Sequence, residues 1–499
     1  MYLALILVLI VVALASLYLK WCRVKSYWAR RGVPHNPPHP VMGSLSFLQK
    51  KNPGIWMREL YDQFKSPYVG IWLFWRPALV VNSLEISRRI LVKDFDAFRN
   101  RLLGSGSGEV DPIGGLGIFT VQDPVWTSIR RKLTPVFTSA KLKSLQTLYS
   151  TKSKELVKRI ESDLANNVPI ELRSLFADYT TDVIGISAFG INSDATLTGK
   201  SLMRNITKDF MTFTFIRGIA WSSIFFIPEL VKVFRFSFYP KNTVIYLRKV
   251  FKEIVSQRGG YNGKTEVNDL LDALRKIKYD ADMNHEDMDE DLILAQAAIF
   301  LQAGFDTSAV VLTFATYELA HHPNAQQKVF NELKAAKEKN GNNDFNDTDL
   351  NELAYFKAVV KETLRKYPAM GWLDRISDRD YRIDDKLVIP AGTTVYVNGN
   401  GIHNDPEFYP EPSQFKPERF LGEEENSSMP FFAFGEGPRA CIGRRFAYRT
   451  IWYALTEIIL KYELHPFPGS KKPVDCHIEK KGLFFAPGER MHVRFIPRY

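Results

Sequence analysis

Cysteine is scarce in this chain, which has only Cys22, Cys441 and Cys476 among its 499 residues. Three cysteines so far apart do not form a disulfide framework, and such low usage is typical of proteins in a reducing compartment. A structural zinc site needs about four ligands, which a single cysteine in any one region does not supply. Any chemistry that a cysteine performs here is therefore the chemistry of an isolated thiol or thiolate.

The chain also lacks several kinds of binding motif. It has no zinc finger, no RNA-recognition signature and no clustered basic tail, so we expect no nucleic-acid partner. It has no motif for a nicotinamide or flavin cofactor. Its 66 Lys and Arg against 55 Asp and Glu give a net charge of +11, which favours anionic surfaces such as lipid or acidic proteins. The 45% of hydrophobic residues is typical of a folded globular protein.

One long hydrophobic run stands at the N-terminus. It is unbroken up to Lys20, is about long enough to span a bilayer and is followed by several basic residues. A cleaved signal peptide with a cleavage site at Ala13-Leu14-Ala15 is the alternative, but no charged region precedes the run. We expect a transmembrane anchor over 1–20, a basic and proline-rich linker over 21–43 and one catalytic domain over 44–499. The positive-inside rule leaves that domain in the cytosol.

The body of the chain is predicted to be mainly helical with a smaller β region. Helical patterns predominate from Asp123 to His322. Within them, residues 210–236 are rich in Phe but interrupted by Arg, Gly and Pro, so a second membrane span is not expected. These aromatics should dip into the membrane interface, line a pocket or form a buried helix hairpin. The longest pattern, 289–322, is apolar nearly all round and is ended by Pro323, so it should cross the protein core.

Acidic residues precede this long helix. Asp280, Asp282 and Asn284 alternate as in a calcium-binding loop. The stretch lacks the glycine at the sixth position, however, and has Asp291 where a bidentate glutamate belongs. We therefore expect an acidic turn that caps the next helix.

The residues that carry the chemistry gather around one cysteine. Residues 431–445 read FFAFGEGPRACIGRR, so Cys441 lies in a glycine-rich loop directly before an apolar helical pattern. The glycines allow tight turns and close approach of the backbone to a flat ligand. Amide groups at the start of the helix, together with Arg439, Arg444 and Arg445, should favour the thiolate. We expect an ionised sulfur that binds a metal, and a buried, inert cysteine is the alternative.

This loop resembles the haem-binding loop of the cytochrome P450 superfamily, and the C-x-x-C-H motif of covalent haem attachment is absent. The resemblance implies a mainly α-helical cytochrome P450 fold with a smaller β region, a haem b (iron protoporphyrin IX) and Cys441 as the axial ligand of its iron. It also implies that Phe434, Gly435 and Ala303 contact the haem. The shared pattern F-x-x-G-x-R-x-C-x-G consists here of Phe434, Gly437, Arg439, Cys441 and Gly443.

A pair of charged residues agrees with this resemblance. Glu362 and Arg365 lie three residues apart on one helix face, which by itself predicts a surface ion pair. The resemblance implies instead a buried structural triad of this pair with Arg419, which orients the loop beneath the haem. Removing one member of such a network would leave an uncompensated buried charge.

A second pair lies earlier in the chain. Trp126 and Arg130 are four residues apart and share a helix face, which by itself predicts a cation–π pair on a surface helix. The resemblance implies that both contact a haem propionate. Arg375 and Arg439 would join them, because propionates need charge-assisted donors.

The stretch AGFDTS, Ala303 to Ser308, lies within the predicted core helix. Thr307 can bond back to the carbonyl four residues earlier and loosen the helix locally, and a satisfied core polar pair is the alternative. The resemblance identifies this stretch with the oxygen-activation motif of the family. It implies that Thr307 and Asp306 are catalytic, Thr307 by positioning a proton for dioxygen and Asp306 by linking the site to solvent. Ile299 and Ala303 should lie on the substrate side.

The whole pattern is most similar to animal microsomal P450s, and especially to insect enzymes related to detoxification. It implies an NADPH-dependent monooxygenase for a lipophilic small molecule, held at the endoplasmic reticulum membrane with its catalytic domain on the cytosolic face. Electrons would come from NADPH-cytochrome P450 reductase, sometimes helped by cytochrome b5. A basic face could dock this partner, with a solvated surface as the alternative. It would consist of Arg131, Lys132, Lys141, Lys143, Arg444 and Arg449.

Two other functions stay open at this point. One is a rearrangement or dehydration of an oxygenated substrate without external electrons, against which the Asp306-Thr307 pair argues. The other is a membrane-bound haem sensor or carrier, which needs neither that pair nor an apolar pocket. The sequence does not predict the substrate or its role. Sequons at Asn205, Asn346 and Asn426 offer a test of topology, because glycans on them would place the body in the lumen.

Overall fold

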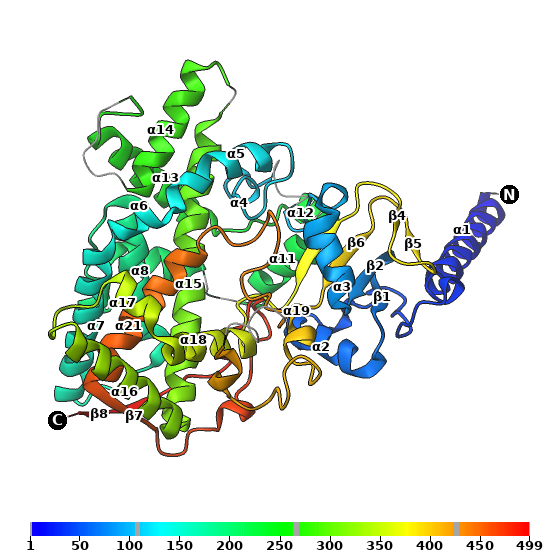
Figure 1. Cartoon of the computed structure of the whole chain (residues 1–499). Helices are drawn as coiled ribbons and strands as arrows, with labels where there is room; N and C mark the ends of the chain where they lie inside the picture. The colour runs from blue at the N-terminus through cyan, green and yellow to red at the C-terminus, as the bar shows by residue number, and fades with distance from the viewer. Residues whose placement is uncertain are drawn as a thin grey trace.

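Helices make up most of the chain, and a small sheet lies on the side from which the N-terminal helix projects (Figure 1). The computed structural model describes residues 2–104, 110–210, 212, 214–262, 269–286, 288–422 and 429–498, so the sequon at Asn426 lies outside the described residues. The predicted mainly helical fold with a smaller β region is confirmed. The α-helices of the described residues are α1 (Tyr2–Lys25), α2 (Pro53–Phe64), α3 (Leu84–Arg88), α4 (Pro112–Gly115), α5 (Val125–Leu133), α6 (Ser139–Lys143), α7 (Gln146–Ala165), α8 (Leu172–Phe189), α9 (Ala195–Thr198), α10 (Leu202–Phe210), α11 (Phe215–Phe226), α12 (Pro228–Phe234), α13 (Lys241–Gln257), α14 (Leu270–Met283), α15 (Glu290–His321), α16 (Pro323–Lys339), α17 (Asp347–Glu352), α18 (Ala354–Lys366), α19 (Gly399–His403) and α21 (Arg444–Lys461).

The main sheet has four strands in the order β1-β2-β6-β3. Strands β1 and β2 form an antiparallel hairpin, β2 pairs with β6 in parallel, and β3 returns antiparallel to β6. The register of the last pair sets Arg375 opposite Val395. The strands of the described residues are β1 (Tyr68–Leu73), β2 (Arg76–Val81), β3 (Leu373–Ile376), β4 (Tyr381–Arg382), β5 (Val388–Ile389), β6 (Thr394–Val397), β7 (Tyr462–Pro466) and β8 (Val493–Pro497).

Helix α15 runs through the centre of the helical part (Figure 1). Its N-cap is Asp289, whose side chain accepts a hydrogen bond from the Asp291 amide at 3.2 Å. It ends at His321, because Pro323 begins the next helix and has no amide hydrogen to continue this one. Of the most apolar part of the helix, 83% is buried in the protein. The predicted core helix over 289–322 is therefore confirmed.

The acidic stretch before α15 differs in part from the expected turn. Asp289 caps the next helix, as expected. Asp280 and Asp282, however, lie in the last turns of helix α14, where Asp282 pairs with Lys278. Asp291 pairs with Arg248. These carboxylates are thus spread over two helices and serve as caps and ion-pair partners.

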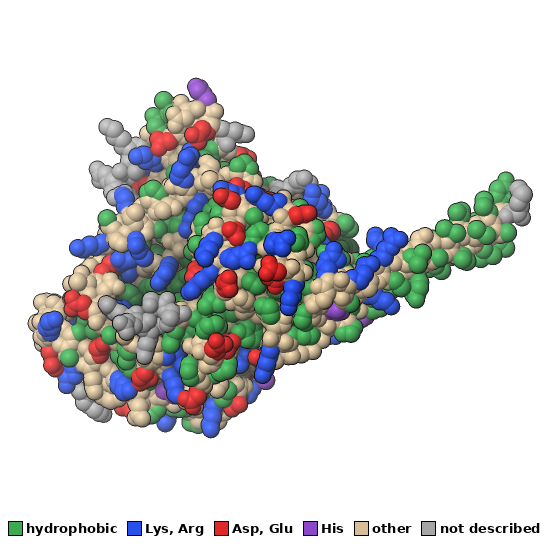
Figure 2. Space-filling model, turned by 45° about the vertical axis from the view of Figure 1, so that its right-hand side comes forward, with side chains coloured by type: hydrophobic (Ala, Val, Ile, Leu, Met, Phe, Trp, Pro, Cys, Tyr) green, Lys and Arg blue, Asp and Glu red, His purple; other side chains and the backbone are tan. Residues whose placement is uncertain are grey.

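Helix α1 projects from the body and has no buried residue (Figures 1 and 2). It is long and apolar enough to cross a membrane, and Figure 2 shows basic side chains where it meets the body. The helix continues past Lys20 to Lys25, and its end is bound to strand β1. The indole nitrogen of Trp72 donates to the Val24 carbonyl at 3.0 Å, and that of the buried Trp28 donates to the Ile71 carbonyl at 3.0 Å. The first residues of the predicted linker are thus helical or packed on the sheet.

The Phe-rich segment forms the two short helices α11 and α12. The inner side of α11 buries Trp221 and Phe226, as a helix hairpin would. Large apolar side chains at the start of α11 and the end of α12 lie in solvent, with exposed fractions of 62% for Phe215, 73% for Ile216 and 61% for Phe234. Such an exposed apolar surface indicates a contact with lipid or with another protein.

Candidate functional site

A cavity lies in the protein interior between helix α15, the cysteine loop and the start of helix α21. Its volume is about 270 Å³. The structure brings to its wall every residue that the sequence predicted as a cofactor contact, a catalytic group or a pocket residue. These are Trp126, Arg130, Ile299, Ala303, Asp306, Thr307, Arg375, Phe434, Gly435, Arg439 and Cys441.

The cysteine loop, residues 431–443, is held by its own backbone. The Cys441 amide donates to the Phe434 carbonyl at 2.8 Å, and the Gly435 amide donates to the Phe432 carbonyl at 2.8 Å. Gly437 has a φ of 74°, in the left-handed region that favours glycine. A Cβ atom at this position would lie 1.9 Å from the carbonyl oxygen of Leu91. Glycine is therefore required here both by the backbone conformation and by this close approach.

The side chain of Cys441 is open to the cavity, which lies deep within the protein. Burial raises the pKa of this thiol, and the Gly443 amide and the guanidinium groups of Arg130, Arg444 and Arg101 only partly oppose this effect. The Gly443 amide and Arg444 thus favour the thiolate as expected, but burial outweighs them. A bound cation at the sulfur would reverse the balance, because a coordinating thiol loses its proton.

Arg439 and Arg445 do not have the role expected of them beside the sulfur. The Arg439 guanidinium turns away, donating to the Arg99 carbonyl at 2.6 Å and to the Val121 carbonyl at 3.2 Å. It also stacks on the Trp126 ring, 4.2 Å from the ring centroid, so the cation–π partner of Trp126 is Arg439. Arg445 is exposed at the start of α21.

Four arginines converge on one side of the cavity: Arg101, Arg130, Arg375 and Arg439. Burial and the charge of Arg101 lower the pKa of Arg375 to about 9. Burial and the charges of Arg101 and Arg375 lower the pKa of Arg439 to about 8. Burial also lowers the pKa of Arg101 and Arg130. The site thus concentrates positive charge that is stabilised only when an anion is present.

The acidic group beside these arginines is Asp374, and one of its two carboxylate oxygens is already engaged by backbone amides. Its Oδ2 atom accepts hydrogen bonds from the amides of Leu102 at 2.7 Å and Leu103 at 3.1 Å. Within the described part of the chain, the Nε atoms of Arg101 and Arg375 have no hydrogen-bond partner. Buried donors without partners indicate a missing acceptor. The cluster fits an anionic ligand.

Sequence reasoning missed Arg101. No motif marks it, and it lies in a connection whose path the sequence does not predict. In the structure two contacts hold Arg101 at the cavity wall. Its guanidinium donates to the Arg439 carbonyl at 3.3 Å and stacks on Phe119, 4.6 Å from the ring centroid.

Helix α15 presents a polar pair to the cavity. The Thr307 hydroxyl donates to the Ala303 carbonyl at 2.7 Å, which confirms the predicted back-bond. Ala303 is exposed although it lies midway along a buried helix, because it faces the cavity. Gly304 allows helix α8 to approach, since a Cβ atom there would lie 2.6 Å from the Ile184 side chain.

The Asp306 carboxylate points toward helix α8. Its Oδ1 atom accepts a hydrogen bond from the Arg173 guanidinium at 3.2 Å. The Asp306 side chain is 7% exposed and that of Arg173 is 28% exposed, so Arg173 connects the buried carboxylate to solvent. Burial raises the pKa of Asp306, and Arg173 opposes the shift. Arg173 is a second residue that the sequence did not predict.

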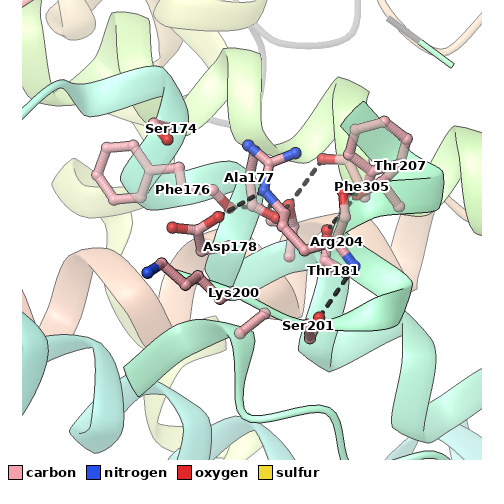
Figure 3. Close-up of polar contacts among 12 residues, drawn as sticks. Ser174, Phe176, Ala177, Asp178, Thr181, Lys200, Ser201, Arg204, Thr207 and Phe305 are labelled. Carbon is pink, nitrogen blue, oxygen red and sulfur yellow. Dashed lines mark hydrogen bonds and ion pairs between the residues drawn. The ribbon is translucent and has the colours of Figure 1, made fainter. Parts of the chain in front are cut away.

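A layer of polar contacts between helices α8 and α10 lies beside this pair (Figure 3). Asp178 pairs with Arg204, and the hydroxyls of Thr181 and Thr207 are 3.0 Å apart. The Thr180 hydroxyl donates to the Phe305 carbonyl at 2.8 Å, directly before Asp306. The bond from Thr180 ties α8 to α15 at the residue before Asp306, and the other two contacts join α8 to α10.

The remainder of the cavity wall is mainly apolar. Aromatic and aliphatic side chains from several elements line it beside Ile299 and Ala303. Such a lining excludes water and suits a lipophilic ligand. It includes Ile118, Phe119, Phe238, Phe300, Met370 and Phe484.

The predicted Glu362, Arg365 and Arg419 triad is assembled behind the cysteine loop. The Glu362 carboxylate accepts two hydrogen bonds from Arg365, at 2.7 and 2.9 Å, and one from Arg419 at 3.2 Å. The side chains of Glu362 and Arg365 are fully buried and that of Arg419 is 7% exposed, so the pair is not a surface ion pair. A buried network of this kind fixes one arrangement, since each group needs its partner.

The predicted basic docking face is only partly available. Arg131, Lys141, Lys143 and Arg444 are exposed, and Lys132 pairs with Glu286 at 2.5 Å. Arg449 is buried and donates to Asp347 at 2.6 Å, so its inclusion in a docking face is wrong.

Known proteins of one family are similar to this chain over nearly its whole length. The family described as Cytochrome P450 matches residues 33–492. Cytochrome P450 6k1 of Blattella germanica is 33% identical over 506 aligned residues, covering 97% of this chain and 95% of the relative. Probable cytochrome P450 6a23 of Drosophila melanogaster is 34% identical, covering 92% and 93% of the two chains. Cytochrome P450 6B2 of Helicoverpa armigera is 30% identical, covering 98% and 97%.

Proposed function

Because this chain belongs to the cytochrome P450 family and is therefore a haem-thiolate monooxygenase, we propose that it oxidises a lipophilic small molecule with electrons from NADPH, delivered by a separate flavoprotein reductase. The observation that carries the proposal is the exposure of Cys441 to a cavity that is also lined by Thr307 and an apolar wall. In the overall reaction, two electrons and two protons reduce one atom of O2 to water, and the other atom enters the substrate.

The cavity fits a haem. We propose that Cys441 ligates the iron and that Arg101, Arg130, Arg375 and Arg439 hold the propionates together with Trp126, because the four guanidinium groups are gathered at the cavity wall and, among the described residues, the Nε atoms of Arg101 and Arg375 have no hydrogen-bond partner. Phe434, Gly435 and Ala303 would contact the ring. When bound, the haem supplies the iron at which dioxygen is reduced and transferred, with a thiolate ligand that favours O–O cleavage.

The protein's own contribution to the reaction is proton delivery and the exclusion of water. We propose that protons enter from solvent at Arg173 and pass Asp306 to reach the hydroxyl of Thr307, which faces the cavity. The hydrogen bond from Thr307 to the Ala303 carbonyl fixes this hydroxyl in one orientation. The apolar wall beside Ile299 orients the substrate and keeps bulk water away.

The electron donor must be another protein, since the chain has no flavin motif. We propose NADPH-cytochrome P450 reductase, with cytochrome b5 as a second donor. The exposed basic residues on α5, α6 and α21 support an acidic partner surface near the cysteine loop, and they raise association rates more than affinity. They are Arg131, Lys141, Lys143 and Arg444.

The membrane is the remaining partner. We propose that residues 1–20 anchor the protein in the endoplasmic reticulum, that 21–43 form the connection and that the catalytic domain over 44–499 faces the cytosol. The exposed apolar helix α1, its basic end and the exposed Phe215 and Phe234 support a body that rests on the bilayer. Glycans on Asn205 or Asn346 would contradict the cytosolic orientation.

The proposal is tested by purifying the full chain and recording the absorption band of its reduced, carbon-monoxide-bound form. Cys441→Ser should abolish the thiolate-type band and turnover, whereas Cys476→Ser, which alters a cysteine outside the cavity, should retain both. Incubation with reductase, NADPH and lipophilic compounds should then give an oxygenated product. Product formation without NADPH would favour an isomerase or dehydratase, and a thiolate-type band with no product would favour a sensor or carrier.

A further inference from the structure

His403 is a buried residue that hydrogen-bonds both to the Glu362–Arg365 pair and to the cysteine loop. His403 lies at the end of helix α19 in the stretch GIHNDPEF and is completely buried. Its carbonyl accepts a hydrogen bond from the Arg365 guanidinium at 2.8 Å. Its Nε2 atom accepts a hydrogen bond from the Phe432 amide at 2.7 Å. Arg365 thus holds the backbone of His403, and the amide of Phe432 in the cysteine loop holds its ring.

The hydrogen bonds define the protonation state of the ring. Because Nε2 accepts from an amide, it carries no hydrogen, and the ring hydrogen lies on Nδ1, 3.2 Å from the Arg365 carbonyl. Burial and the charge of Arg365 lower the pKa of His403 to about 3. The imidazole is therefore neutral at physiological pH, with its acceptor directed at the loop.

The ring also contacts the side chains that lead into the loop. It stacks on Phe431 with a centroid distance of 5.7 Å and an interplanar angle of 17°, and it contacts Phe432 at 6.2 Å and 12°. From Phe432 the path to the sulfur is short: the Phe432 carbonyl accepts from Gly435, and the Phe434 carbonyl accepts from Cys441. The bond to His403 holds the first of these residues.

We propose that His403 is a positioning residue that transmits the order of the Glu362–Arg365 pair to the cysteine loop through the hydrogen bond that its ring accepts from the Phe432 amide. The inference rests on the proposed role of Cys441 as the haem ligand. His403 is not among the described residues that line the cavity, so it does not act on substrate or cofactor directly. We expect His403 to affect the rate at which Cys441 is lost as the thiolate ligand of the haem.

Two amide variants separate this role from simple packing. In His403→Gln, the amide oxygen reaches about as far as Nε2 and can still accept from Phe432, whereas in His403→Asn the shorter amide reaches only about as far as Nδ1. Both are tested as full-length, haem-loaded protein. The measurements are haem content, the rate at which the thiolate-type band of the reduced, carbon-monoxide-bound form converts to the thiol-type band, and hydrogen exchange of the Phe432 amide.

The expected result is a split between the two variants. His403→Gln should convert within about twofold of the wild type, and His403→Asn should convert about tenfold faster with faster exchange of the Phe432 amide, because a buried donor has lost its acceptor. Thr363→Val is the matched control, since it removes another buried hydrogen bond, from the Thr363 hydroxyl to the Val359 carbonyl at 2.9 Å, without touching the loop. It should convert like the wild type.

Equal behaviour of the Gln and Asn variants would overturn the inference, as would fast conversion in Thr363→Val. If His403→Asn does not fold, His403→Met replaces it, because Met has similar length but only a weak acceptor; it should convert about tenfold faster than His403→Gln. Equal conversion of the Met and Gln variants would also overturn the inference. A wild-type protein without the thiolate-type band would instead contradict the proposed function.

Discussion

On the cysteine side of the cavity, hydrogen bonds and ion pairs fix the loop, the arginine cluster and the buried triad, whereas the substrate side is lined by apolar side chains such as Phe119, Phe238 and Phe300. Polar groups with directional partners allow one arrangement. Apolar packing tolerates changes of shape and volume more readily. A change on the first side should therefore affect folding and cofactor retention, and a change on the second should affect which molecules bind.

The largest effect should follow from breaking the buried triad. Glu362→Gln leaves the charges of Arg365 and Arg419 without a full partner, and the free energy of unfolding should fall by about 3–5 kcal/mol. Glu59→Gln is the control, because Glu59 forms an exposed ion pair with Lys51 that contributes about 1 kcal/mol or less. Denaturant unfolding of the haem-loaded proteins measures both. Similar losses of unfolding free energy in Glu362→Gln and Glu59→Gln would contradict a special role for the buried triad.

A pH series tests the neutral state of His403. Its pKa is about 3 in the folded protein and about 6.5 when unfolded, so the unfolded state binds the extra proton between these values. Stability from this residue is complete above about pH 6.5 and is lost as the pH falls toward 3. Relative to His403→Gln, the wild type should lose about 2 kcal/mol between pH 7 and pH 5. Parallel unfolding curves for the two proteins at both pH values would contradict this assignment.

The polar pair on α15 lies where the two sides meet. Thr307→Val removes the hydroxyl that faces the cavity, and the yield of product per NADPH consumed should fall at least about tenfold because protons are no longer positioned. Thr313→Val is matched to it, since the Thr313 hydroxyl makes the same back-bond, to the Ala309 carbonyl at 2.7 Å, but lies outside the cavity wall. The prediction fails if the two variants couple NADPH to product equally well.

The smallest effect on stability should come from the substrate side. Ile299→Phe fills space in the cavity, so the free energy of unfolding should change by less than about 1 kcal/mol while bulky ligands bind several-fold more weakly. Leu301→Phe, two residues away in the packed core, should cost about 1–3 kcal/mol without changing ligand preference. Ligand titration and thermal unfolding separate the two outcomes.

The same contrast explains which features the sequence predicted. The cysteine loop, the pair Glu362–Arg365 and the pair Asp306–Thr307 are short motifs, so their members are identified together. Arg101, Arg173 and His403 contribute through contacts with residues more than 35 positions away, and no local pattern marks them. The thiol pKa was misjudged because the sequence shows nearby arginines but not the extent of burial. Arg449 was misassigned because its partner Asp347 lies 102 residues earlier.

The join between helix α1 and the sheet has a consequence for how the enzyme meets other proteins. Trp72 binds the end of the helix, and a Cβ atom on Gly70 would lie 2.4 Å from the Trp28 ring, so this corner leaves little room for a swivel. With residues 1–20 in the membrane as proposed, this corner would fix the height and tilt of the body above the lipid. The protein would then meet a partner in the same bilayer by lateral diffusion and by rotation about the membrane normal.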